Sequence, residues 1–151
     1  FKAFSEQVPN VVLALVGDGP MLNTIKVMVA RLGIEEKVIF LGLRRDIPQC
    51  LRAMDIFLFP SRFESLGLAA IEAQAAGLPI VWSDVPGLRE AIAPHWKNYG
   101  VSPDDPEMIC RKLMEIMHEP KCRPTEFLEY FSQEKASQRL LDAYKAALAQ
   151  G

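Results

Sequence analysis

Two glutamates, Glu64 and Glu72, flank residues 65–71 within the run FPSRFESLGLAAIE, where a strand-like apolar segment gives way to a helix-like one. A carboxylate accepts hydrogen bonds from two or more hydroxyl groups. A helix N-terminus between two carboxylates offers free backbone N–H groups and the positive end of the helix dipole to a diphosphate. A sugar nucleotide carries hydroxyls at both ends and a diphosphate in its middle, so this arrangement can hold one.

Each glutamate taken alone has an ordinary structural explanation. Glu72 can mark the solvent-facing stripe of a helix, and Glu64 can be a favourable charge at a helix N-terminus. Taken as a pair they favour a binding site, because no Lys or Arg lies one turn from Glu72 and eight helical steps span about 12 Å, the reach from a ribose to a hexose. Gly67 has no Cβ and would let a ligand approach the first-turn amides.

A glycine pair, Gly17 and Gly19, follows the first apolar run of the chain. The ends of such strands are where open α/β sheets bind ligands, but a tight strand-to-helix turn explains the glycines equally well. Leu22 stands where a dinucleotide fingerprint has its third glycine, and the Lys of a P-loop is missing. The sequence therefore predicts neither a dinucleotide site nor a nucleoside triphosphate site.

A second loop, with Leu43, Arg44 and Arg45, follows the next apolar run. Either arginine can approach a base or a phosphate, although Asp46 as a helix N-cap and two solvated arginines explain the sequence nearly as well. Residues 84–87 indicate a turn. No metal site is predicted, because no Cys, Asp or Glu stands at ligand spacing around His95 or His118, and no serine hydrolase elbow is present.

The elements that must position these residues alternate along the chain. Continuous apolar runs predict buried strands, and the segments between them predict helices, which together favour a doubly wound, Rossmann-like parallel α/β sheet. The last part of the chain, residues 119–151, is expected to be a linker and a helical tail, within one domain of residues 1–151. The predicted strands are 11–16, 38–41, 56–59, 79–82 and 99–101, and the predicted helices are 1–7, 20–32, 47–54, 66–76, 87–93, 106–117 and 127–149.

Composition limits the function classes. With 151 residues, half of them hydrophobic, the chain can bury a real core, and its net charge of −2 gives no basic footprint for nucleic acid. Three cysteines without a C-x-x-C pair favour a reducing, cytoplasmic location, and no segment has the length of a membrane span. Because the chain starts with Phe1 inside a helix-like segment, we expect it to be part of a longer protein.

Three segments together resemble the C-terminal, donor-binding domain of the group 1 glycosyltransferases, the retaining GT-B enzymes of family 4. The segments are LALVGDGP, VIFLGLRRDIPQCLRAMDIFLFPSRFESLGLAAIEAQAAGLPIV and FSQEKASQRLLDAYKAAL. The resemblance covers about the whole chain, and the central segment joins the paired glutamates to the other family strings in the family's order.

The resemblance implies a role for each candidate residue. Glu64 would contact the transferred sugar near the reacting carbon and act as the catalytic residue, and Glu72 would hold the ribose. The other donor-binding residues would be the amides from Ser65 through Leu66 and Gly67 to Leu68, the glycines Gly17 and Gly19 at the interdomain cleft, and Leu43 and Arg44 beside the nucleobase. Such enzymes need no metal or other cofactor, because helix dipoles and cations meet the phosphate charge.

Two departures from the family pattern limit these expectations. The Arg and Lys that neutralise the leaving diphosphate lie upstream in the family, as does the acceptor-binding N-terminal domain, so this polypeptide alone should bind a donor weakly and transfer nothing. The family's G-G-x-P-E and D-G-x-x-G strings appear here as VPGLREAIAPHWKNYGV, which leaves the roles of Gly87 and Glu90 open.

In the doubly wound order the first βα strand, which is missing here, would be the central one, between strands 11–16 and 56–59. We therefore expect exposed apolar surface or a partner chain beside them. A homodimer is one such arrangement, and the apolar face of the terminal helix can also take part in it. A closed six-stranded sheet in a monomer would contradict this.

The sequence thus predicts the donor half of a retaining hexosyltransferase that uses a nucleoside diphosphate sugar and is cytoplasmic or membrane-peripheral. The alternatives are a noncatalytic nucleotide- or sugar-binding module and a signalling domain of the response-regulator type, which would need more acidic residues after the first strand than Asp18. The sequence leaves the choice among UDP, GDP and ADP open, along with the sugar and the acceptor, which could be a glycan, a lipid or a small molecule.

Overall fold

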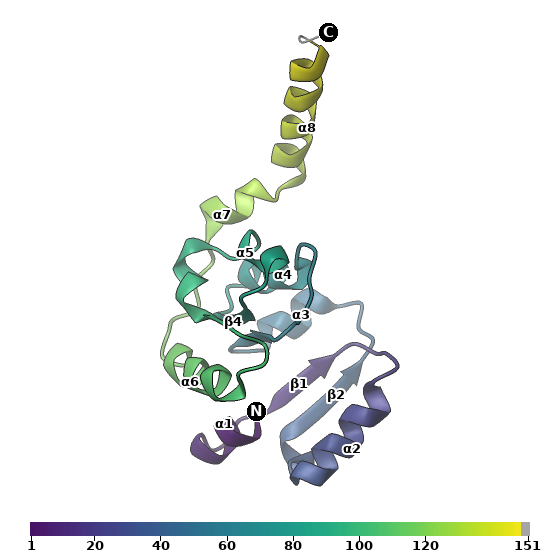
Figure 1. The fold of residues 1–151 in the computed structure, drawn as a ribbon, viewed down its shortest axis with the longest axis vertical. Coiled ribbons are helices and arrows are strands. Elements are labelled where there is room, and N and C mark those ends of the chain that lie inside the picture. The colour runs from purple at the N-terminus through teal and green to yellow at the C-terminus, as the bar shows by residue number, and fades with distance from the viewer. Residues whose placement is uncertain (149–151) are drawn as a thin grey trace.

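The computed structural model describes residues 1–148 as helices alternating with parallel strands (Figure 1). The strands are β1 (Leu13–Val16), β2 (Val38–Gly42), β3 (Phe57–Phe59), β4 (Ile80–Ser83) and β5 (Gly100–Val101). The α-helices are α1 (Lys2–Gln7), α2 (Leu22–Leu32), α3 (Ile47–Arg52), α4 (Leu68–Ala75), α5 (Pro86–Arg89), α6 (Pro106–Ile116), α7 (Thr125–Tyr130) and α8 (Gln133–Leu148), and η1 (Glu35–Lys37) and η2 (Pro94–Tyr99) are 3₁₀ helices.

The strands form two separate parallel sheets. In one sheet β1 pairs with β2, and Leu13 lies opposite Val38. In the other the order is β3, β4, β5, and Phe57 lies opposite Ile80. Parallel neighbours joined through helices confirm the predicted Rossmann-like α/β class.

No hydrogen-bonded ladder joins β1 to β3 within residues 1–148. A cavity of about 1110 Å³ lies between these strands and is lined by both of them. Apolar residues on this side are left exposed: Val12, just before β1, is 55% exposed, and Ile39 of β2 is 49% exposed. The gap and the exposed apolar surface predicted from the sequence are therefore confirmed, while the partner expected there stays a prediction.

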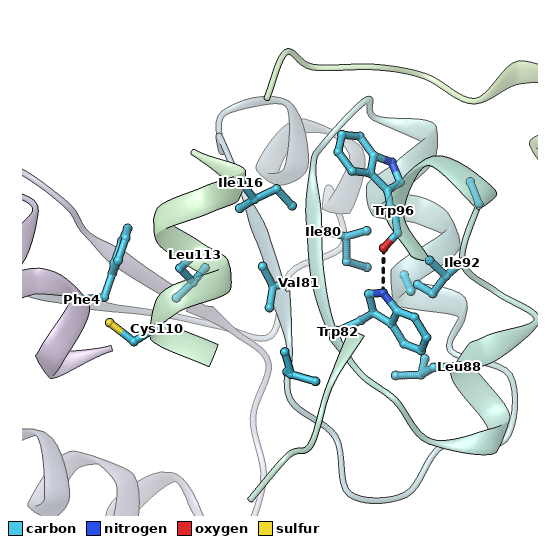
Figure 2. Packing of buried hydrophobic residues seen from close by; sticks show 13 residues of the cluster. Phe4, Ile80, Val81, Trp82, Leu88, Ile92, Trp96, Cys110, Leu113 and Ile116 are labelled. Atoms are coloured by element: carbon cyan, nitrogen blue, oxygen red, sulfur yellow. Dashed lines mark hydrogen bonds between the residues drawn. The ribbon is translucent and has the colours of Figure 1, made fainter. Parts of the chain in front are cut away.

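The largest core cluster surrounds β4, all four residues of which are buried. Figure 2 shows Val81 facing Leu113 and Ile116 of α6, and Trp82 near Leu88 and Ile92. The indole Nε1 of Trp82 donates a 3.0 Å hydrogen bond to the carbonyl of Trp96. Both faces of β4 are covered, which explains why its sequence is a continuous apolar run without polar residues at every second position.

Several element boundaries differ from those predicted. The helix expected at 66–76 begins at Leu68, because Gly67 takes left-handed φ and ψ of 72° and 50° and ends the preceding loop. The helix expected at 87–93 is the short α5, and 3₁₀ helix η2 replaces the start of the strand expected at 99–101. The strand expected at 11–16 begins at Leu13, so the first two residues of that apolar run remain outside the ladder.

The helical tail predicted at 127–149 is two helices, α7 and α8, and residue 149 lies outside the described residues. Phe127 and Phe131 of the α7 segment contact each other with ring centroids 5.2 Å apart. Helix α8 extends away from the rest of the molecule (Figure 1) and has no buried residue. Its apolar side chains are accordingly exposed, and they are Leu140, Leu141, Tyr144 and Leu148.

Candidate functional site

The candidate catalytic residue Glu64 lies in the loop between β3 and α4. It is half-buried, and one of its carboxylate oxygens accepts a 3.2 Å hydrogen bond from the backbone N–H of Ser65. The loop is also linked to the segment after β5 by an exposed ion pair between Arg62 and Asp104, at 2.7 Å. Glu64 is therefore held at the carboxyl end of β3, where ligands bind in open α/β sheets.

The N-terminus of α4 follows this loop directly. Ser65, Leu66 and Gly67 belong to the loop, and Leu68 is the first helical residue. Among residues 1–148, no side chain caps the helix. The first-turn N–H groups thus keep donor capacity that an anionic ligand can use.

Glu72 lies one turn into α4 and is exposed. Within residues 1–148 it forms no ion pair, as the sequence predicted. It lines the cavity between β1 and β3 together with Ala69. The carboxylate is free to accept hydroxyl donors, although exposure alone also fits a solvent-facing stripe.

The glycine loop after β1 is joined to the loop after β2. The N–H of Gly17 donates to the carbonyl of Gly42 at 2.8 Å, and Gly17 has a φ of 129°. The N–H of Gly19 donates to the carboxylate of Asp18 at 2.7 Å. A hollow of about 270 Å³ lies against this loop, so Gly17 and Gly19 border open space as a ligand loop requires.

In the loop after β2, the predicted N-cap role of Asp46 is wrong. Asp46 stands at the N-cap position of α3, but its side chain does not cap the helix. Instead it accepts two hydrogen bonds from Arg44, at 2.8 and 2.6 Å. These hydrogen bonds raise the pKa of Arg44 and lower the pKa of Asp46. Arg44 is therefore already paired, whereas Leu43 beside it is 81% exposed.

The structure brings the candidate residues together in two groups. Gly17 and Gly19 share one group with the loop of Leu43 and Arg44, and the segment from Glu64 to Glu72 is the other. Within the part of the chain that the structure describes, no hydrogen bond or ion pair joins the two groups. They belong to the two sheets that the cavity separates.

Sequence reasoning missed the contact between α5 and the Glu64 loop. Gly87 and Leu88 of α5 lie against residues 64–67, whereas the sequence left the role of Gly87 open. A glycine just after the proline that starts a helix was the available signal. The Arg62–Asp104 pair gave no signal, because its partners are far apart in the chain.

Among residues 1–148, no group of three or more His, Cys, Asp or Glu side chains could hold a metal ion. Metal independence of the reaction stays a prediction. Over the same residues, every helix is too short or too polar to cross a membrane.

Comparison with known proteins decides the family. The model of the glycosyl transferases group 1 matches residues 1–145. The chain belongs to this family. The resemblance seen in the sequence is therefore confirmed, and glycosyl transfer is the general reaction of the group 1 glycosyltransferases that this chain matches.

Two relatives illustrate the range of this group 1 family. The chain is 30% identical over 110 residues to an Escherichia coli UDP-Gal:alpha-D-GlcNAc-diphosphoundecaprenol alpha-1,3-galactosyltransferase, covering 72% of the chain and 28% of the relative. It is 41% identical over 93 residues to N-acetyl-alpha-D-glucosaminyl L-malate synthase of Bacillus anthracis. That match covers 60% of the chain and 24% of the relative. The chain thus spans about a quarter of the length of these relatives.

A solved structure confirms the fold of this group 1 chain. HepE from Anabaena, crystallised with UDP-glucose, superposes with a TM-score of 0.83 at 22% identity, over 96% of this chain and 44% of HepE. The predicted GT-B type of fold is confirmed.

Proposed function

We propose that this chain is the donor-binding half of a retaining glycosyltransferase that transfers a hexose from a nucleoside diphosphate sugar to a glycan, lipid or small-molecule acceptor. The observation that carries the proposal is the uncapped N-terminus of α4 between Glu64 and Glu72 in a member of the group 1 family. That segment offers N–H donors for a diphosphate and carboxylates for the hydroxyls on either side of it.

Each part of the segment has a separate task in this proposal. The amides of Ser65, Leu66, Gly67 and Leu68 stabilise the negative charge that develops on the leaving diphosphate. Glu64 orients the transferred sugar as positive charge develops at its reacting carbon, and Glu72 holds the ribose. The loops with Gly17 and Gly19 and with Leu43 and Arg44 complete the donor site. Metal ions take no part, because N–H groups and cations balance the phosphate charge.

We propose UDP as the nucleotide. The name of the E. coli relative contains UDP-Gal, and HepE was crystallised with UDP-glucose. Calorimetric titration of UDP and GDP into the complete enzyme tests this choice, and tighter binding of GDP would contradict it.

The matches cover 28% and 24% of the two relatives, whose remaining length is enough for an additional acceptor domain. In this proposal that domain supplies the other half of the active site. Residues 1–151 alone are then inactive. The three cysteines are free thiols within the described structure, which supports the proposed cytoplasmic location, where the intact enzyme can be membrane-peripheral.

The experiment that tests the site compares Glu64→Ala with Glu72→Ala in the complete enzyme. Glu64→Ala should lower kcat by about 100-fold or more while donor Kd changes little, because its contact matters in the transition state. Glu72→Ala should raise donor Kd by about 10- to 100-fold, because it removes hydrogen bonds to a charged acceptor.

Glu36→Ala is the matched control. Glu36 is exposed and lies in η1, before the start of β2 and thus at the opposite end of that strand from the proposed site. It should leave kcat and donor Kd unchanged. Equal losses of both parameters in Glu64→Ala and Glu72→Ala would contradict the assigned roles.

A further inference from the structure

Gly87 is the second residue of α5, and its φ lies outside the left-handed region. Alanine is the better helix former at such a position. The local backbone of α5 therefore gives no reason for glycine. The reason must come from what lies next to the Cα of Gly87.

The backbone of the Glu64 loop occupies that place. A Cβ added at Gly87 would overlap the carbonyl oxygen of Glu64, and it would lie 2.5 Å from the carbonyl carbon of Glu64 and 3.0 Å from that of Ser65. These atoms are backbone and cannot rotate away. Any side chain at position 87 must therefore displace the peptide groups of residues 64 and 65.

Leu88 contacts the other end of the same loop. A Cβ added at Gly67 would overlap Cδ2 of Leu88, which is fully buried. Gly67 also needs its left-handed conformation to start α4. Two consecutive residues of α5 thus touch the loop at Glu64 and at Gly67.

Helix α5 is itself anchored on both sides. Before the helix, the N–H of Asp84 donates to the carbonyl of Val101 at 2.8 Å, and the carboxylate of Asp84 accepts a 2.6 Å hydrogen bond from Arg89. After the helix, the buried amide of Gln74 in α4 donates to the carbonyl of Ala91 at 2.7 Å. The surface that faces the loop is therefore fixed to β5 and to α4.

We propose that α5 sets the backbone position of residues 64–67 and that Gly87 is a positioning residue for Glu64. This inference rests on the proposed function. Glu64 and the amides that follow it must lie accurately against the reacting carbon and the leaving diphosphate. A shift of about 1 Å in such a group can cost about 100-fold in rate.

The test is Gly87→Ala in the complete enzyme. We expect kcat to fall by about 100-fold, because the loop is displaced. The Kd for UDP should rise by a smaller factor: the displaced amides also meet the diphosphate, but Glu72 and the glycine loop keep their positions. The split between kcat and Kd is the readout that a purely structural defect would not produce.

Gly100→Ala is the matched control. A Cβ at Gly100 would lie 2.8 Å from the ring of Trp82, so it disturbs core packing through a side chain, whereas a Cβ at Gly87 meets the backbone of the Glu64 loop directly. It should lower Tm with little effect on kcat. If the two variants lose Tm and kcat in the same proportion, or if Gly87→Ala keeps the normal kcat, the inference is overturned.

Leu88→Val decides the matter if Gly87→Ala yields no folded enzyme. It removes the methyl group that contacts Gly67 and should lower kcat more than it weakens UDP binding, whereas a normal kcat would overturn the inference. The proposed function fails separately, if Glu64→Ala retains normal transfer. Loss of transfer in Glu64→Ala with normal kcat in Gly87→Ala would overturn the positioning role alone.

Discussion

At the scale of single residues, Gln74 determines which face of α4 meets the protein. Its buried side chain donates to the carbonyls of Ala70 and Ala91 and accepts a 2.8 Å hydrogen bond from the N–H of Ala93. Glu72, two residues earlier, then falls on the opposite side of the helix and is exposed. One satisfied buried amide thus keeps the carboxylate directed away from the core.

Replacing this amide should cost stability. In Gln74→Leu the N–H of Ala93 and the carbonyl of Ala91 lose their partner, and each buried group left unpaired costs about 1–3 kcal/mol. Urea unfolding of the purified protein measures the change. Gln49→Leu, at an exposed position of α3, is the control and should change the free energy of unfolding little.

At the scale of elements, the junction of η2 and β5 is tied to the segment after α6. The hydroxyl of Tyr99 donates to the carboxylate of Glu119 at 2.8 Å. Burial, together with this hydrogen bond, raises the pKa of Tyr99 to about 12 from 10.0. The folded state therefore favours the neutral phenol over the phenolate.

A pH dependence of stability follows from the raised pKa of Tyr99. Below pH 10 the phenol is protonated in both the folded and the unfolded state, and its full contribution to the free energy of unfolding is present. Between pH 10 and 12 the unfolded chain releases the proton while the folded chain retains it, so the contribution is lost as pH rises.

Comparison of wild type with Tyr99→Phe isolates this contribution, because other groups that titrate in this range are common to both proteins. The difference in free energy of unfolding, measured in urea, should shrink from pH 9 to about pH 12. A constant difference over that range would show that Tyr99 is not held neutral by the fold.

At the scale of the whole molecule, two apolar surfaces remain uncovered within the described residues. One faces the cavity between β1 and β3, and the other is the side of α8 with Leu141 at 53% and Tyr144 at 62% exposure. Water contact at such surfaces is unfavourable, by about 25 cal/mol for each Å² of apolar area. Self-association is the expected response when the polypeptide of residues 1–151 is isolated.

Light scattering of the isolated polypeptide tests this prediction. We expect a concentration-dependent dimer, and we expect Leu141→Ser with Tyr144→Ser to weaken it, because two apolar side chains of the α8 face are removed. Gln138→Ser, on the same helix, should leave the dimer intact. A monomer at all concentrations would exclude the homodimer.

The sequence determined the order of strands and helices and the family. Strands such as β4 are buried on both faces and so leave continuous apolar runs, and glycine and proline mark the turns through their own backbone preferences. The paired glutamates and the glycine loop were recognisable because their spacing is local. The gap between β1 and β3 was expected because the family resemblance implies a central strand upstream of this chain.

Tertiary structure decided the contacts between residues distant in the chain. The glycine at position 87 signalled a special position, but the structure shows that the neighbour is the backbone of Glu64. The structure also places Leu88 of α5 against Gly67 and joins Arg62 to Asp104. Such outcomes depend on which surfaces meet once the elements pack, and the local preferences of a sequence do not contain that information.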